Sequence, residues 1–163
     1  MKKKILIVDD DHDIHPLIVK IIEKVNKQDG NKFGDIDNML ADLKGQENKD
    51  SASSDQSGVE FTFDHAFQGE EALKFIEQAN GTTPYDVVFM DVRMPPGIDG
   101  IQTIKEVRKQ KPEYPFIICT AYMDYTWEEV VKILGSESNI ALMKKPFTKQ
   151  KILENLKTLF KEG

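Results

Sequence analysis

The sequence contains one cysteine and no long hydrophobic run, and acidic residues outnumber basic ones. Because Cys119 stands alone, the chain can form neither an internal disulfide nor a cysteine-rich zinc site. The apolar run that follows Lys4 stops at Val8, which is too short for a signal peptide or a membrane span. These absences predict a cytoplasmic protein that does not enter a membrane.

Basic residues are too few to predict a surface for nucleic acid. The chain has 22 Lys and Arg against 28 Asp and Glu, a formal net charge of −6. A chain with this charge is repelled by phosphate backbones and by anionic membrane surfaces. We therefore expect neither nucleic acid nor a membrane as a direct partner.

The composition is that of one globular domain. The chain has 163 residues, of which 39% are hydrophobic and 31% charged. We expect a single domain over residues 1–163, interrupted at 29–58 by an acidic, low-complexity insert between the first helix and the second strand. Inside the insert, helical spacing of four apolar residues predicts a short amphipathic helix that packs on its own domain or docks on a partner: Phe33, Ile36, Leu40 and Leu43.

Short apolar segments of strand length recur along the rest of the chain. In four of them apolar residues do not alternate with polar ones, which is typical of strands covered on both faces: Ile5–Val8, Val87–Met90, Phe116–Thr120 and Ile140–Met143. In the remaining segment, Val59–Asp64, apolar and polar residues alternate.

Helical patterns separate these strands. The first runs from Ile14 to about Lys27, the second begins at Gly69 and the third contains Ile101–Val107. The fourth runs from a capping box at Thr126 to Gly135, and the fifth begins at Thr148. Five strands that alternate with five helices predict an α/β fold, a doubly wound parallel sheet with helices on both faces.

Charged or hydroxyl side chains stand at the carboxyl ends of four of the predicted strands. Asp9 and Asp10 follow the first strand, Asp91 follows the third, Thr120 ends the fourth and Lys145 follows the fifth. In open α/β sheets the carboxyl ends of the strands share one edge, and ligands bind there. We therefore expect these side chains to meet.

Such a set suits phosphoryl chemistry. Three crowded carboxylates repel one another, so one must take up a proton or a cation must join them, and Mg²⁺ prefers oxygen ligands of this kind. A carboxylate can also act as a nucleophile toward phosphorus, while an ammonium and a hydroxyl stabilise the phosphoryl oxygens. Each residue alone has a simpler interpretation as a helix cap, strand residue or solvated charge.

Four segments together resemble the receiver domain of two-component response regulators. They are an acidic pair after the first strand, the segment around Asp91, a Thr-Ala pair after the fourth strand and a Lys-Pro-Phe sequence: Asp9-Asp10, Phe89-Met90-Asp91-Val92-Arg93-Met94-Pro95, Thr120-Ala121 and Lys145-Pro146-Phe147. The resemblance covers nearly the whole chain outside the insert. It implies a flavodoxin-like sheet in the order 2-1-3-4-5.

The resemblance also implies a role for each site residue. Asp91 would accept a phosphoryl group from a sensor histidine kinase or a histidine phosphotransfer protein, which makes the chain a signalling domain rather than an enzyme. Asp10, Asp91 and the carbonyl of Arg93 would bind Mg²⁺ directly, and Asp9 would bind it through water. Thr120 and Lys145 would contact the phosphoryl group.

Further expectations follow from the resemblance. The Lys145–Pro146 peptide bond would be cis, because a tight turn aims the lysine inward and X–Pro bonds adopt cis at low cost. A homodimer would form through the fourth helix, the fifth strand and the fifth helix. The effector is left open, and the chain would be either a stand-alone receiver or a part of a longer protein.

Three features depart from the family pattern. The loop after the acceptor holds an additional proline, Pro95-Pro96-Gly97, so its position beside the site is expected to differ. Position 142 is Leu where the family often has Tyr or Phe, so we expect that burial of an aromatic ring there does not transmit the output. The insert at 29–58 replaces a short turn.

Two other functions fit parts of the pattern. A phosphatase of the haloacid-dehalogenase type also uses an aspartate, a threonine and a lysine with Mg²⁺, but it needs a second aspartate two residues after the nucleophile as general acid, and Arg93 stands there. A receiver-shaped binding module that is never phosphorylated is the other alternative. His12, His15 and His65 lack metal-ligand spacing, and we expect them at the surface.

Overall fold

The computed structural model describes residues 2–28, 59–78, 85–121 and 125–161, and within them the chain forms one five-stranded parallel sheet. The strands are β1 (Lys2–Val8), β2 (Glu60–Ala66), β3 (Val87–Asp91), β4 (Phe116–Thr120) and β5 (Ile140–Lys144). Their order is β2-β1-β3-β4-β5, which confirms the predicted topology. The second strand runs to Ala66 rather than Asp64, because its pairing with β1 extends to Val8.

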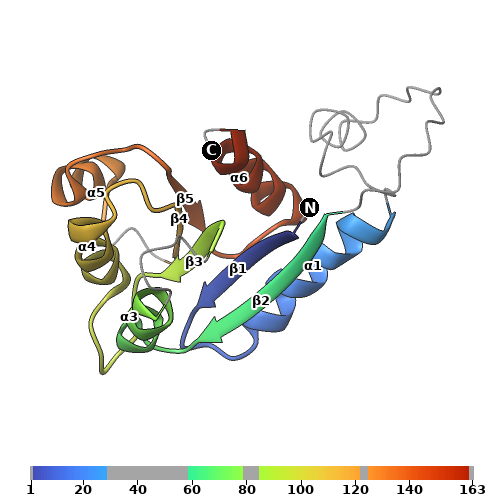
Figure 1. Cartoon of the computed structure of the whole chain (residues 1–163), viewed down its shortest axis with the longest axis horizontal. Helices are drawn as coiled ribbons and strands as arrows, with labels where there is room; N and C mark the ends of the chain where they lie inside the picture. Colours follow the sequence, from blue (N-terminus) through green and yellow to red (C-terminus); the bar gives the residue numbers. More distant parts are fainter. Residues whose placement is uncertain (1, 29–58, 79–84, 122–124, 162–163) are drawn as a thin grey trace.

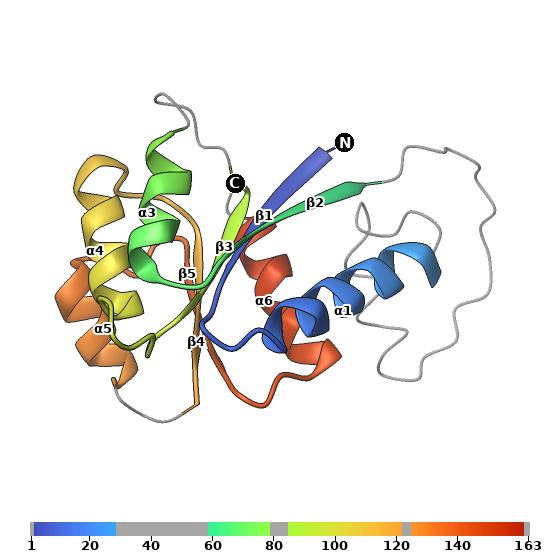
Figure 2. The same ribbon diagram turned by 90° about the horizontal axis from the view of Figure 1, so that it is seen from below.

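Five helices in the described residues cover the two faces of this sheet (Figures 1 and 2). On one face lie α1 (Ile14–Gln28) and α6 (Lys149–Lys161), and on the other lie α3 (Gly69–Glu77), α4 (Gly100–Gln110) and α5 (Trp127–Leu134). Because both faces are covered, polar residues inside the strands would be buried, which explains the unbroken apolar runs.

Successive residues of β1 show how the sheet serves two cores. Ile5 and Ile7 pack in the cluster with α1 and α6, whereas Leu6 and Val8 pack in the cluster with α3, α4 and α5. All four are essentially inaccessible to solvent. The alternation of side chains along a strand therefore divides one apolar run between two layers.

Helix starts are defined by side-chain caps. Thr126 and Glu129 form the predicted capping box of α5, and Gly135 ends that helix with a left-handed φ of 74°. Asp99 caps α4, with its Oδ1 accepting from the Gln102 amide at 2.8 Å. These caps hold the helix starts that follow β3 and β4 in place.

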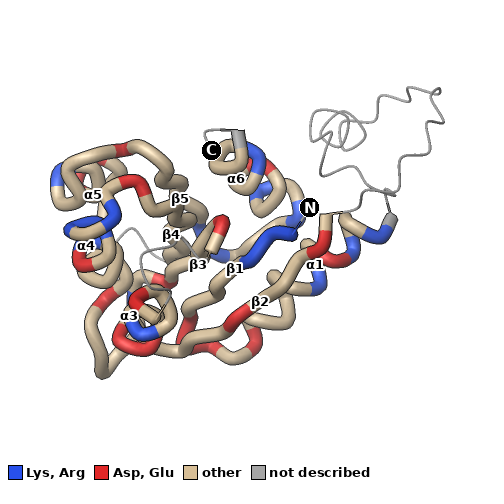
Figure 3. Tube along the Cα trace, viewed as in Figure 1, with Lys and Arg blue, Asp and Glu red and all other residues tan. Residues whose placement is uncertain are grey.

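The insert leaves the fold at the amino end of the sheet. Asn26 in the last turns of α1 donates from Nδ2 to the Val59 carbonyl at 2.7 Å, and Glu60 pairs with Lys2 at the start of β1. Figure 3 shows the lysines of this end as a blue stretch on β1. The amphipathic helix predicted around Phe33 lies outside the described residues. In the part of the chain described, no helix is long and apolar enough to span a membrane.

We predict that a short turn in place of residues 29–58 leaves a folded sheet. The bond from Asn26 to Val59 already holds the two attachment points together, and the carboxyl ends of the strands lie at the opposite edge. Urea unfolding followed by circular dichroism should remain cooperative, and the phosphorylation of Asp91 expected from the sequence should be unaffected. A deletion variant that folds and yet takes up no phosphoryl group would place the insert in the site.

Candidate functional site

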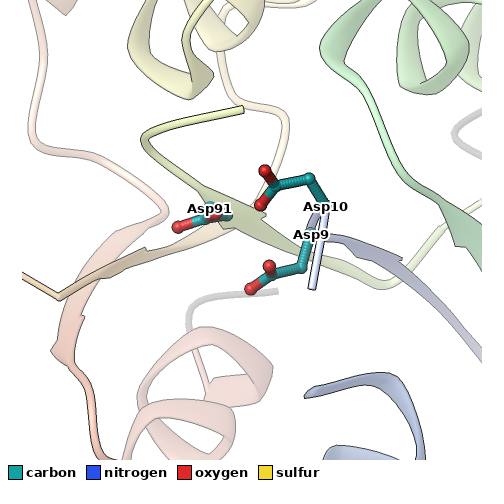
Figure 4. Close-up of side chains that lie close together, drawn as sticks. All are labelled: Asp9, Asp10 and Asp91. Carbon is teal, nitrogen blue, oxygen red and sulfur yellow. The ribbon is translucent and has the colours of Figure 1, made fainter. Parts of the chain in front are cut away.

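Three carboxylates meet where β1 and β3 end. One oxygen each from Asp9, Asp10 and Asp91 lies within 4.8 Å of the other two, and Figure 4 shows the three side chains beside one another. The register causes this proximity, because Val8 pairs with Met90 and the next residues on the two parallel strands are Asp9 and Asp91. Asp9 is 2% exposed and Asp91 is 6% exposed, so their charges are poorly solvated.

Lys145 places its ammonium between two of these carboxylates. Its Nζ lies 2.7 Å from Asp9 Oδ2 and 3.3 Å from Asp91 Oδ1. Its backbone amide donates to the Thr120 carbonyl at 2.8 Å, which ties the turn after β5 to the end of β4. The Lys145–Pro146 bond is cis, as predicted.

Burial and neighbouring charges shift the pKa values of Asp91 and Lys145 for different reasons. Burial, followed by the negative charge of Asp9, raises the pKa of Asp91 to about 7, against the opposing effect of Lys145. Burial alone would lower the pKa of Lys145, but its hydrogen bond to Asp9 and the charge of Asp91 outweigh that effect and raise it. The charged form of Lys145 is therefore stabilised, while burial and the neighbouring charge oppose ionisation of Asp91.

The polar residues expected at this edge line one cavity of about 290 Å³. Asp9, Asp10, Asp91, Thr120 and Lys145 all contribute to it, together with Asp11, Val92, Arg93 and Ala121. The side chain of Arg93 is exposed, whereas Thr120 is buried. The structure thus brings every sequence-predicted site residue to one place.

Asp9 has a hydrogen bond at each of its polar atoms. Its amide donates to the Ala66 carbonyl at 3.1 Å, its Oδ1 accepts from the Asp11 amide at 2.9 Å and its Oδ2 accepts from Lys145. Its carbonyl accepts from His15 Nε2 at 2.8 Å. Backbone and side chain of Asp9 are therefore both fixed before any ligand arrives.

His15 corrects an expectation from the sequence, because it is 4% exposed rather than at the surface. Its Nδ1 lies 2.8 Å from Nδ1 of His65, which is half-buried, while His12 is exposed and stacks on Phe67. The helical spacing of His15 with Ile18 and Ile22 was the signal for burial. A second strand extended to Ala66 brings His65 opposite it.

The proline-rich loop after β3 is tied to the start of α3. Glu70 Oε1 accepts from the Ile98 amide at 3.0 Å, and Gln68 Nε2 donates to the Pro95 carbonyl at 3.4 Å. The bond from the Ile98 amide lowers the pKa of Glu70. The Pro95–Pro96 bond is cis. No pattern in the sequence indicated this contact between Glu70 and Ile98.

Comparison with known proteins gives a consistent result. A family model described as "Response regulator receiver domain" matches residues 54–157. The alkaline phosphatase synthesis transcriptional regulatory protein PhoP of Bacillus subtilis is 34% identical over 99 residues, which are 60% of this chain and 38% of that protein. The chain thus spans about two-fifths of that relative. Asp9 and Asp10 precede the matched range, so their place in the site comes from the structure.

Solved structures agree on the fold. The receiver domain of Francisella response regulator 1452 is 28% identical, with a TM-score of 0.55 and coverage of 98% of this chain and 97% of that one. The chemotaxis protein CheY4 of Vibrio cholerae is 21% identical, with a TM-score of 0.63 and coverage of 98% and 99%. The latter similarity concerns the fold alone.

We predict that, without divalent ions, the contribution of Asp91 to stability is lost as pH rises from 5 to 8. The folded pKa of Asp91 is about 7 against an ordinary value of 3.8, so the folded state binds the proton more tightly across that window. Urea unfolding at both pH values should show a smaller loss of unfolding free energy for Asp91→Asn than for wild type. Equal losses would contradict the raised pKa.

The histidine pair predicts two definite tautomers. A carbonyl only accepts, so His15 carries a proton on Nε2; in the pair of neutral rings its Nδ1 then accepts and His65 donates from Nδ1. Burial, followed by the charge of His15, lowers the pKa of His65, which favours a neutral His65 ring. Long-range ¹H–¹⁵N NMR should report these tautomers, with exposed His12 as the reference ring. An Nδ1–H tautomer at His15 would refute the assignment.

Proposed function

Because the chain belongs to the family of response regulator receiver domains, a family of signalling modules, we propose that Asp91 is the phosphoryl acceptor of this chain. The observation that carries the proposal is the juxtaposition of Asp91 with Lys145 and the other carboxylates in one cavity. Asp91 is the carboxylate at the end of β3, flanked by β1 and β4, so residues from both neighbours reach the same group.

The proposed reaction moves one phosphoryl group. An oxygen of Asp91 attacks phosphorus of a phosphohistidine, the phosphorus–nitrogen bond breaks with its electron pair going to the imidazole, and an acyl phosphate forms. Burial leaves the attacking carboxylate poorly hydrated, so little water has to be displaced before the attack. The donor class is a sensor histidine kinase or a histidine phosphotransfer protein.

Lys145 and Thr120 are proposed to stabilise the transferred group. The ammonium of Lys145 already contacts Asp91 Oδ1 at 3.3 Å, so a phosphoryl group on that residue would lie within its reach. Thr120 lines the same cavity at the end of β4, where its hydroxyl can donate to a phosphoryl oxygen. Asp9 holds the lysine from the other side.

The acidic cluster fits Mg²⁺. Its donors are all carboxylate oxygens within 4.8 Å of one another, and one ammonium does not balance three negative charges. We propose that Asp10, Asp91 and the Arg93 carbonyl bind the ion directly and that Asp9 binds it through water. When bound, the ion would neutralise charge on the phosphoryl oxygens.

The wider role is that of a switchable signalling domain in the cytoplasm. PhoP is by its name a transcriptional regulatory protein, and this chain covers 38% of it, so we propose that the output of this chain is delivered through a partner or another region. A homodimer through α5, β5 and α6 remains a prediction. Arg93 cannot serve as the general acid of a phosphatase at neutral pH, which favours phosphoryl acceptance over turnover of phosphomonoesters.

We predict that a small acyl phosphate with Mg²⁺ labels wild-type protein and that Asp91→Asn takes up no phosphoryl group, because an amide cannot replace the carboxylate nucleophile. Intact-protein mass spectrometry and ³¹P NMR would measure this. Asp13→Asn, at an exposed position before α1, is the matched control and should label as wild type does. Stable label on Asp91→Asn, or on a histidine, would refute the assignment.

A further inference from the structure

One hydrogen bond joins the starts of two helices beside the site. Tyr125 Oη donates to Asp99 Oδ2 at 2.9 Å. Asp99 immediately precedes α4, and Tyr125 lies just before α5. Both residues are half-buried, and the Tyr125 ring packs against the apolar cluster between the sheet and helices α3, α4 and α5. Neither residue lines the acidic cavity.

Asp99 is followed by Gly100, which contacts the backbone of Asp91 and Val92. The Gly100 amide donates to the Val92 carbonyl at 2.8 Å, and a Cβ on Gly100 would collide with the Asp91 carbonyl oxygen. Only glycine permits this approach. Since Asp99 also caps α4 through its other oxygen, the cap, the helix start and the acceptor backbone form one rigid unit.

The Tyr125 end belongs to the segment that leaves Thr120. Thr120 and Ala121 line the site cavity, and Thr126 begins the capping box of α5. The Thr120 carbonyl accepts from the Lys145 amide, so this segment is also tied to the lysine that contacts Asp91. Thr120 at the site and Tyr125 before α5 lie close together in the sequence.

Leu142 and Tyr125 contact the same apolar cluster but differ in polarity. Leu142 packs half-buried against the same apolar cluster as Tyr125 and Trp127, but it has no hydroxyl. Tyr125 supplies a ring and a hydroxyl in this layer from a neighbouring element.

We propose that the Tyr125–Asp99 hydrogen bond couples the state of Asp91 to the start of α5, making Tyr125 a positioning residue for the output. This inference rests on the proposed phosphoryl acceptance by Asp91. Since the bond joins the unit that carries Asp91 to the residue before α5, this coupling requires that the strength of the bond differ between the free and the modified site. By linkage, removing it must then change the affinity of the site for a phosphoryl mimic.

The test is a thermodynamic cycle with beryllium trifluoride and Mg²⁺ as the phosphoryl mimic. Trp127 is the only tryptophan of the chain and lies in the first turn of α5, so its fluorescence reports on that helix start. Tyr125→Phe, which removes only the hydroxyl, should change the apparent Kd of the mimic by about threefold or more. It should also reduce the Trp127 response by about half or more.

A matched control separates coupling from general destabilisation. Tyr85→Phe removes another tyrosine hydroxyl that donates to an aspartate, Asp64, at 2.7 Å, and it lies away from the site cavity. This variant should lose stability and yet bind the mimic as wild type does. Asp99→Ser keeps a hydroxyl that can cap α4 but lacks the second oxygen that accepts from Tyr125, so it should reproduce the effect of Tyr125→Phe. The double variant should show no further change.

The outcomes distinguish this inference from the function on which it rests. If wild type binds the mimic at Asp91 but both Tyr125→Phe and Asp99→Ser match it in Kd and in Trp127 response, the bond is only structural and the inference is overturned. If wild type fails to bind the mimic and also fails to take label from an acyl phosphate, the proposed function and this inference fall together.

Discussion

The structure depends on one unbalanced electrostatic arrangement, in which a single ammonium faces three carboxylates at the end of a parallel sheet. Lys145 neutralises part of the charge of Asp9 and Asp91, and burial prevents water from screening the rest. A site with this excess stabilises a proton, a divalent cation or both. Uptake of either relieves the repulsion among the three carboxylates.

The sheet makes this arrangement possible because its strands are parallel and covered on both faces. Parallel pairing brings the carboxyl ends of β1, β3, β4 and β5 to one edge, and each strand supplies a different group there. The apolar residues that precede these groups pack in two cores, which fix the backbone positions. The geometry of the site is thus a consequence of burial elsewhere.

The features that could be predicted from the sequence are those that depend on residues close together in the chain. The apolar runs of β1 and β3, the capping box at Thr126 and the strand-end position of Asp91 each depend on neighbouring residues, and topology then brings the strand ends together. Contacts between distant segments were not predictable in this way. The bonds from His15 to Asp9, from Ile98 to Glu70 and from Tyr125 to Asp99 need coordinates, because no spacing rule relates their partners.

The departures from the family pattern lie where the sheet tolerates change. The insert attaches at the amino end, where Asn26 holds Val59, so its length does not alter the register that aligns Asp9 with Asp91. Leu142 satisfies the apolar layer on its face of β5, so packing alone does not require an aromatic ring there. Packing accepts either residue, but a polar signal through this layer needs a hydroxyl. Leu142 has no hydroxyl, whereas Tyr125 touches the same cluster and also bonds to Asp99, the residue before the glycine that contacts the backbone of Asp91.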